Sequence, residues 1–327
     1  MRVIVTKITD DITEGEKNAI VDGFNQCFPK HSKSITELFG KYHSNHYGYS
    51  FHALCYEDDN LIGFISAIPF KYKYHDENIT VALTSDIFIK EEARGDFTLF
   101  AQLYKRLKES CLPENIVCFL GVANENAYTY SVRILRCKEV MTLPYWILPV
   151  RAGGILKKKC GVLLNVFSVS FSFLALWCNQ LVSMIFNSRA NTPACSIVVD
   201  DLFLHYRLAD SRYQNIIDGR YGFTYRITND EGVKCAYILF LSQNGTRTYR
   251  ALCKCVSYIL HHESVDMIMF NGTLNLKQGL LLKTPKRFEP RALHLTVNFL
   301  TKGFETQYSD IMQPNGIDFT LLNLDVR

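Results

Sequence analysis

The stretch FHALCYEDDNLIGFISAIPF, residues 51–70, decides the fold. Apolar runs on both sides of the acidic turn at residues 57–60 predict two strands joined in a hairpin. The pattern returns in FTYRITNDEGVKCAYILFLS, residues 223–242, where residues 229–232 supply the turn. A supersecondary unit that occurs twice in 327 residues predicts two similar domains, each large enough for its own core.

Outward from the first hairpin, the sequence predicts alternating strands and helices. Thr13 and Glu16 have the spacing of a capping box, which opens a helix. Leu99, Leu103 and Leu107 recur at helical spacing, and the apolar run IVCFLGV behind them is typical of a buried strand. The other elements predicted for the first half are a strand over 3–8, the helix to about residue 28, a helix near 35–42 and a strand over 80–89.

Outward from the second hairpin, Asn244 and Gly245 predict a turn into a strand near residues 248–252, followed by a short helix. The run VDMIMFNG, beginning at Val265, then echoes the buried strand of the first half. The second copy has no counterpart of the Arg94-Gly95 turn that precedes the first copy's helix. Any chemistry of that turn is therefore expected in the first copy alone.

Composition excludes several classes of protein. Hydrophobic residues make up 48% and charged residues 21%, as in soluble globular proteins. The net charge of +4 is spread along the chain, so we expect no nucleic-acid partner. The start of the chain lacks the pattern of a secretory signal, and the eleven cysteines include no CxxC pair. We therefore expect a cytoplasmic protein with reduced, mostly buried thiols.

Residues 161–186 differ in composition from the rest of the chain, because they carry no charge. They follow the basic run Lys157, Lys158 and Lys159. Serines, asparagines and a glutamine interrupt the segment, which disfavours a lipid-exposed span. Three hypotheses remain for it: a helix lying on a membrane surface, a membrane span, and a linker helix packed against its own domains. We expect contact with a membrane surface through residues 157–186. The apolar stripe at helical spacing consists of Leu164, Phe167, Phe171, Leu174, Cys178, Leu181 and Ile185.

The chain resembles the GNAT acyltransferase fold, an α/β fold built on a mixed α+β sheet. The resemblance is carried by SDIFIKEEARGDFTLFAQLYKRL (85–107), GVANENAYTYSVRILRCKEVMTLPYWILPV (121–150), FLHYRLADSRY (203–213) and FTLLNLDVR (319–327). As a pair of such domains, the chain resembles tandem GNAT proteins encoded beside bacterial surface-polysaccharide genes. More distantly, it is similar to the aminoacyl transferases of peptidoglycan assembly. The domains implied are a GNAT-like acyltransferase domain over 1–151, a basic and apolar helical linker over 152–195, and a second, degenerate GNAT-like domain over 196–327.

The resemblance implies an acyl-CoA-dependent N-acyltransferase with acetyl-CoA as co-substrate and a small-molecule amine as acceptor. The tandem family implies an amino sugar or a related cell-surface polysaccharide precursor as acceptor, and a cytoplasmic location that includes the inner membrane face. Two rival hypotheses are a non-catalytic GNAT-like scaffold that binds a ligand or partner, and a transferase that uses aminoacyl-tRNA.

The family's coenzyme loop, Arg/Gln-x-x-Gly-x-Gly/Ala, matches residues 94–99 here. Backbone amides and the dipole at a helix N-terminus favour a bound pyrophosphate. Phe97 and Leu99 stand where the family has small residues, and the same segment also fits an ordinary turn with Asp96 as a helix cap. The positions that the resemblance assigns to the coenzyme are Arg94, Gly95, Asp96, Phe97, Thr98 and Asn124.

Transfer of an acyl group from a thioester to an amine needs a base for the amine and a proton donor for the thiolate. The resemblance places the base at Asp86, which otherwise is an ordinary strand carboxylate. It places the donor at Tyr130 or Tyr128, of which we favour Tyr130; core packing is the alternative for both. We expect no metal site, and we expect the histidines of KYHSNHYGYSFH to contact substrate or solvent; these are His43, His46 and His52.

Overall fold

The computed structural model describes residues 2–95, 97–156, 161–209, 211–313 and 315–324. The chain forms two compact units, and each unit is assembled from three separate stretches. Unit 1 consists of Met1–Thr142, Ala194–Arg207 and Arg291–Ile317. Unit 2 consists of Leu143–Pro193, Leu208–Pro290 and Asp318–Arg327. Both units are therefore drawn from both halves of the sequence.

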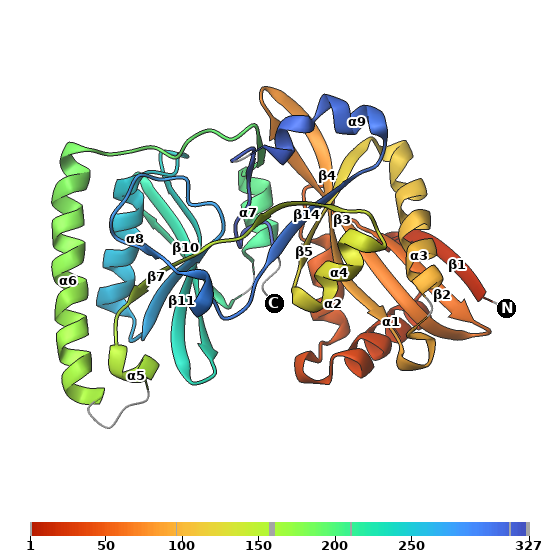
Figure 1. Ribbon diagram of the computed structural model, residues 1–327, viewed down its shortest axis with the longest axis horizontal. Helices are drawn as coiled ribbons and strands as arrows, with labels where there is room; N and C mark the ends of the chain where they lie inside the picture. Colours follow the sequence, from red (N-terminus) through yellow and green to blue (C-terminus); the bar gives the residue numbers. More distant parts are fainter. Residues whose placement is uncertain (1, 96, 157–160, 210, 314, 325–327) are drawn as a thin grey trace. The chain divides into compact units, whose positions relative to one another are not determined.

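Unit 1 is built on a mixed sheet whose order is β1-β2-β3-β4-β5-β14-β6, with β8 beside the far end of β3 (Figure 1). Neighbouring strands are antiparallel except β4 and β5, which are parallel and connected through the helix α3. The strands are β1 (Arg2–Ile8), β2 (Phe51–Glu57), β3 (Asn60–Tyr74), β4 (Glu77–Ile89), β5 (Ile116–Ala123), β6 (Lys138–Thr142), β8 (Cys195–Ile197), β14 (His294–Phe299) and the short β15 (Ile317–Asp318). The helices are α1 (Glu14–Cys27), α2 (Ile35–His43), α3 (Phe97–Cys111), α4 (Glu125–Arg133), α7 (Asp201–Arg207) and α9 (Lys302–Gln307).

Unit 2 is built on a second mixed sheet, with the order β13-β7-β12-β11-β10-β9. Its parallel pair is β11 and β12, and the helix α8 connects them. The strands are β7 (Tyr145–Pro149), β9 (Tyr213–Asp218), β10 (Tyr221–Asp230), β11 (Val233–Gln243), β12 (Met267–Asn271) and β13 (Leu282–Lys283). The helices are α5 (Ala152–Leu156), α6 (Gly161–Ile185) and α8 (Tyr249–His262).

The local predictions for both hairpins are confirmed. β2 and β3 pair in antiparallel register around the acidic turn, and so do β10 and β11. Glu231 and Gly232 both have positive φ, the conformation of a two-residue turn that matches the twist of the strands. The capping box of Thr13 and Glu16 also opens α1 as predicted.

The repeat is displaced by one strand from its predicted alignment. Residues 249–262 form α8, capped by Thr248, where the sequence predicted a strand near 248–252. β11 consequently precedes the crossover helix, as β4 does in unit 1, so that β10 and β11 correspond to β3 and β4. Helical spacing of buried Leu252, Val256 and Ile259 against β10 and β11 explains why the helix prevails.

The division of the chain differs from the predicted boundaries at 151 and 195. β7 pairs with β12 in unit 2, although it precedes the predicted linker. β14, from the C-terminal half of the sequence, pairs with β5 and β6 in unit 1. The predicted linker over 152–195 contains α5 and α6, which belong to unit 2.

His52 lies in the core of unit 1, where it is fully buried among Phe39, Tyr42 and Phe64. Its Nε2 atom makes a 2.7 Å hydrogen bond with the Ser50 hydroxyl. Burial lowers the pKa of His52 from 6.5 to about 3. The ring is therefore neutral in the folded protein near neutral pH.

This buried ring predicts an acid-side loss of stability. Between pH 6.5 and about 3, the unfolded chain binds a proton at His52 that the folded chain does not bind. The free energy of unfolding therefore falls as pH falls, by up to about 1.4 kcal/mol per pH unit. Urea unfolding of the wild type and of His52→Phe at several pH values measures this effect. The free energy of unfolding of the wild type should fall more steeply with acidity than that of the variant. Parallel curves for the two proteins would contradict the assignment.

Candidate active site

β4 and β5 diverge at their carboxyl ends. Their pairing runs from Thr80↔Ile116 to Leu83↔Leu120 and stops there, whereas β4 continues to Ile89 and β5 to Ala123. Both strands lie wholly within the described residues. Backbone groups on the facing edges are therefore directed into the space between two parallel strands instead of into a ladder. A bound extended chain can satisfy such groups.

Asp86 lies at this divergence. The register between β3 and β4 shifts between Phe64 and Ser66, and Asp86 takes the left-handed φ of 49° beside that bulge. A non-glycine residue rarely adopts this conformation, and such strain is concentrated at functional sites. The sequence placed Asp86 on a strand, but only the bulge shows how its carboxylate is turned.

The carboxylate of Asp86 is paired with Lys41 of α2. Lys41 Nζ lies 2.8 Å from Asp86 Oδ2 and 2.6 Å from the Ser85 hydroxyl. The two side chains are only 5% and 8% exposed. Burying one of these charges without its partner would be costly. The pair fixes the position of the Asp86 carboxylate where the two strands separate.

The loop before α3 has the predicted turn. Gly95 has a φ of +103°, which favours glycine, and nothing lies within 4 Å of the position that a Cβ atom would occupy. Arg94 Nε donates a hydrogen bond of 3.1 Å to the Ile89 carbonyl, and the residue is exposed. Phe97 is the first residue of α3 and Thr98 is exposed in its first turn, while Asp96 lies outside the described residues. An exposed guanidinium therefore stands near the positive end of a helix, an arrangement suited to phosphate.

α4 begins at the end of β5. Asn124 caps it, because its Oδ1 atom accepts a 2.9 Å hydrogen bond from the Ala127 amide. This structural role accounts for the side chain that the resemblance had assigned to the coenzyme. The position nevertheless lies directly after the diverging end of β5.

The two candidate tyrosines have different surroundings. Tyr128 donates a 2.5 Å hydrogen bond to Glu139 and stacks on His294 with ring centroids 4.1 Å apart. The bond to the carboxylate raises the pKa of Tyr128, which makes its proton harder to release. Tyr130 is 45% exposed and, being two residues away, points about 200° around the helix from Tyr128.

Glu139 and His294 complete a small network that the sequence analysis missed. His294 Nδ1 lies 2.9 Å from Glu139 Oε1, and Thr142 donates a 3.3 Å bond to the same oxygen. Burial pushes the pKa of Glu139 up, but the hydrogen bonds from Tyr128 and His294 outweigh it, so the pKa lies below its ordinary value. No local pattern could identify this network, since 155 residues separate Glu139 from His294.

These geometries predict opposite effects for two conservative substitutions. With Tyr130 as the proton donor that the resemblance implies, Tyr130→Phe should lower turnover at least tenfold without changing the affinity for acyl-CoA. Tyr128→Phe should leave turnover within about twofold and slightly lower the free energy of unfolding, because the bond to Glu139 is lost. Steady-state kinetics and urea unfolding of both variants measure this. Exchanged phenotypes would assign the donor to Tyr128.

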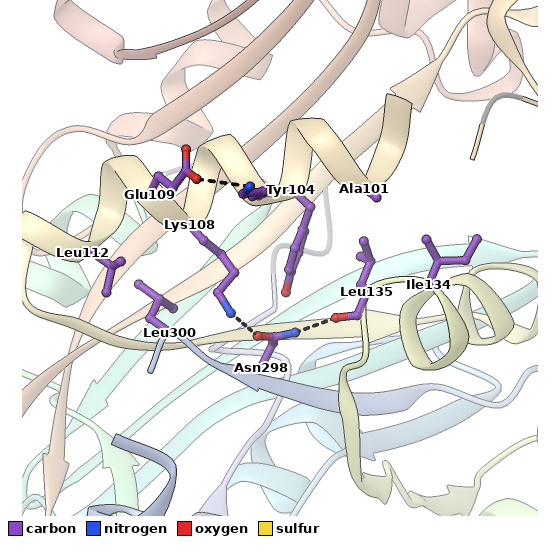
Figure 2. Close-up of a pocket in the computed structure, with 10 residues that line it drawn as sticks. Ala101, Tyr104, Lys108, Glu109, Leu112, Ile134, Leu135, Asn298 and Leu300 are labelled. Carbon is purple, nitrogen blue, oxygen red and sulfur yellow. Dashed lines mark hydrogen bonds and ion pairs between the residues drawn. The ribbon is translucent and has the colours of Figure 1, made fainter. Parts of the chain in front are cut away.

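A surface pocket of about 350 Å³ also occurs in unit 1, but at the other end of α3 (Figure 2). Lys108 projects into it and donates a 2.8 Å hydrogen bond to Asn298, which in turn donates to the Leu135 carbonyl. Burial lowers the pKa of Lys108. Its position near the start of β5 and the end of β14 separates this pocket from Asp86 and the coenzyme loop.

Unit 2 fills the equivalent position with its own chain. The pairing of β11 and β12 stops at Ile238↔Phe270, while β11 continues to Gln243. Arg247 then donates to the Thr273 carbonyl and to both carboxylate oxygens of Asp318, each bond 3.1 Å or shorter. Its guanidinium also lies 5.7 Å from the ring centre of Phe270. This occupied arrangement favours unit 1 as the place for chemistry.

The histidine predictions need correction. His52 is in the core, and His46 is stacked on Phe203 at 4.6 Å and bonded to the Val198 carbonyl at 2.7 Å. Burial lowers the pKa of His46. His43 lies near the end of α2 with its ring bonded to the Gly48 carbonyl. Across the described part of the chain, no group of three or more His, Cys, Asp or Glu side chains is arranged to hold a metal ion.

A mixed sheet whose central parallel pair is linked by a helix and diverges at its carboxyl end is the GNAT fold. The chain has this fold in a two-domain α/β form, as the sequence predicted. No protein-family model matches the chain, and no curated protein matches it in sequence.

Solved structures share the fold. One is a probable N-acyltransferase of unknown function from Enterococcus faecalis, with 11% identity over 93% of this chain and 74% of that chain, at a TM-score of 0.55. A GCN5-related N-acetyltransferase from Anabaena variabilis has 11% identity over 91% and 73% of the two chains, at 0.56. N-myristoyltransferase from Saccharomyces cerevisiae, with bound myristoyl-CoA, has 10% identity over 91% and 82%, at 0.51.

Proposed function

We propose that the protein is an acyl-CoA-dependent N-acyltransferase whose reaction occurs in unit 1. One observation carries the proposal: a strained, ion-paired Asp86 stands where β4 and β5 separate, in a GNAT fold. The named solved structures with this fold include an N-acetyltransferase and an N-myristoyltransferase with bound myristoyl-CoA. Acetyl-CoA is the acyl donor that we favour.

The residues of unit 1 fit acyl-CoA in a defined way. Arg94, beside the start of α3, carries the positive charge for the pyrophosphate, and Gly95 allows close approach of the loop. The open edges of β4 and β5 offer backbone donors and acceptors to the amide-containing arm of the coenzyme. Phe97, Thr98 and Asn124 border this region as the first residues of α3 and the cap of α4.

The proposed chemistry uses two side chains. The amine nitrogen attacks the thioester carbon, and Asp86 accepts the proton that the nitrogen loses. Collapse of the tetrahedral intermediate breaks the carbon–sulfur bond, and Tyr130 gives its proton to the departing thiolate. Lys41, 2.8 Å away, holds the Asp86 carboxylate in position. The products are an amide and free coenzyme A.

For the acceptor we propose an amino sugar or a related precursor of a cell-surface polysaccharide. The support is the resemblance to tandem GNAT proteins of polysaccharide gene clusters. The burial of Asp86 and its pairing with Lys41 favour one alternative, a GNAT-like protein that binds a ligand without transferring an acyl group. In that alternative the ion pair is structural.

A thiol-release assay with acetyl-CoA and a set of amino-sugar nucleotides distinguishes these functions. We expect release of coenzyme A that depends on one of the amines. Arg94→Ala should reduce this release chiefly by raising the KM for acetyl-CoA tenfold or more. Arg133→Ala, which changes an arginine at the end of α4, is the matched control. Acetyl-CoA binding without release for any amine would support the binding protein.

A further inference from the structure

The helix α6 carries its large apolar side chains outward. Among the described residues it is the one helix long and apolar enough to cross a membrane, yet only 11% of its most apolar window is buried. Phe167 is 74% exposed, Trp177 57% and Ile185 74%. The other large exposed side chains of this face are Val162, Leu163, Val166, Phe171, Phe173, Leu174, Leu181, Val182, Met184 and Phe186.

The polar side chains of α6 face inward. Ser172 is buried and donates a 3.0 Å hydrogen bond to the Pro149 carbonyl, while Asn165 accepts from the Gly153 amide at 2.8 Å. Near the other end, Tyr249 of α8 donates to Asn179, and Arg250 donates to the Ser183 carbonyl at 2.9 Å. α6 is thus bonded along its length to unit 2, beside α8 (Figure 1).

This arrangement reverses an ordinary surface helix, which buries its apolar face. Most of the predicted stripe lies on the exposed side, whereas Ser172, Ser183 and Leu176 are buried on the side that packs against unit 2. The packed-linker hypothesis therefore describes that side of α6 and leaves the exposed apolar side without a contact. A span is disfavoured because the same polar bonds tie α6 to α8 and β7, which would have to follow it into hydrocarbon.

The edges of the exposed face are basic. Arg250 borders the C-terminal end of α6, and the ring of His261 lies 5.4 Å from that of Phe173. α8, which contains both residues, has no carboxylate from Tyr249 to His262, although its Lys254 is paired with Asp218 of β9 at 2.9 Å. An anionic lipid surface complements this combination, whereas a second copy of the chain would bring the same basic groups against it.

A pocket of about 510 Å³ opens at the C-terminal end of the same face. Val182 and Phe186 of the exposed face line it, together with Asn187, Ser188, Tyr249 and Lys277. Apolar walls with one amine are suited to a phospholipid, whose phosphate and upper acyl chain carry the matching charge and apolar surface. The exposed apolar face and the pocket are therefore both suited to anionic phospholipid.

We propose that α6 docks unit 2 on an anionic phospholipid membrane and lies in the plane of its interface. The apolar side chains enter the boundary between headgroups and acyl chains, while Arg250 and Lys277 remain at headgroup depth. Lys157, Lys158 and Lys159 lie outside the described residues, and the proposal does not depend on them. It is also independent of acyl transfer.

Flotation with vesicles and the fluorescence of Trp177 test this docking. We expect the full-length protein to float with vesicles of phosphatidylglycerol and phosphatidylcholine, at least tenfold more than with phosphatidylcholine alone, and to detach as salt is raised. The emission should shift to the blue on binding, and Trp177→Phe should abolish that shift while flotation continues. Bromine placed near the headgroups should quench the emission more than bromine at the chain ends.

Matched variants keep the test specific. Phe167→Ser combined with Phe171→Ser should lower flotation at least tenfold, whereas Ile217→Ser, which changes an 87% exposed apolar residue of β9, should not. Circular dichroism verifies that each variant is folded. Absence of flotation, strongest quenching by chain-end bromine, or a dimer in lipid-free solution that the double variant makes monomeric would each overturn the proposal.

Discussion

Asp86→Asn is expected to lower turnover by about 10²- to 10⁴-fold while the KM for acetyl-CoA changes by less than about threefold. The substitution removes the proposed base but retains the size of the side chain, and the proposed pyrophosphate loop begins at Arg94 instead. Steady-state kinetics on variant protein verified as folded by circular dichroism measures both constants. Asp76→Asn, at a fully exposed turn of the same sheet, is the matched control and should behave as the wild type.

Wild-type turnover in Asp86→Asn would contradict its role as base and leave the ion pair as a structural feature of unit 1.

Lys41→Met is expected to destabilise unit 1 by about 3 to 5 kcal/mol. Removing the ammonium leaves the Asp86 carboxylate buried without its charged partner, at 8% exposure. Urea unfolding of the full-length variant measures the loss. The double variant Lys41→Met with Asp86→Asn should recover part of it, because no uncompensated charge then remains.

Lys73→Met is the matched control for this prediction. Lys73 lies 3.6 Å from Asp76, and both side chains are exposed, so the free energy of unfolding should change by less than about 0.5 kcal/mol. Equal small effects from Lys41→Met and Lys73→Met would show that the buried pair contributes little to folding.

Local patterns predicted the parts of the fold that local forces determine. The two hairpins follow from alternating apolar residues around acidic turns, and α1 follows from the capping box of Thr13 and Glu16. α8 was missed at its start because Tyr249 and Cys253 suit a strand as well as a helix, and burial against the sheet of unit 2 decides between them.

The exchange of β7 and β14 between the two halves could not be predicted from the sequence. Both strands have apolar residues that suit either sheet, and the choice depends on pairing across more than 100 residues. The direction in which the apolar stripe of α6 points could not be predicted from the sequence either. Periodicity defines an apolar face, but it does not determine whether that face packs against the protein or is exposed.

For the candidate site, the sequence supplied positions and the structure supplied partners. Asp86 and the Gly95 turn were named from the resemblance, and their bulge and positive φ are visible only in three dimensions. Lys41 was missed because it lies 45 residues before Asp86 on a different element. The different surroundings of Tyr128 and Tyr130 became visible only with Glu139, which accepts a hydrogen bond from Tyr128.

The most direct test of the account is calorimetric titration of the full-length protein with acetyl-CoA. We predict binding of one equivalent per chain, since Arg247 and Asp318 occupy the corresponding position in unit 2. Arg94→Ala should weaken that binding about tenfold or more, or about 1.4 kcal/mol, while Asp86→Asn leaves it unchanged. Absence of binding at millimolar acetyl-CoA, or binding that Arg94→Ala does not affect, would contradict the central claim that unit 1 is an acyl-CoA site.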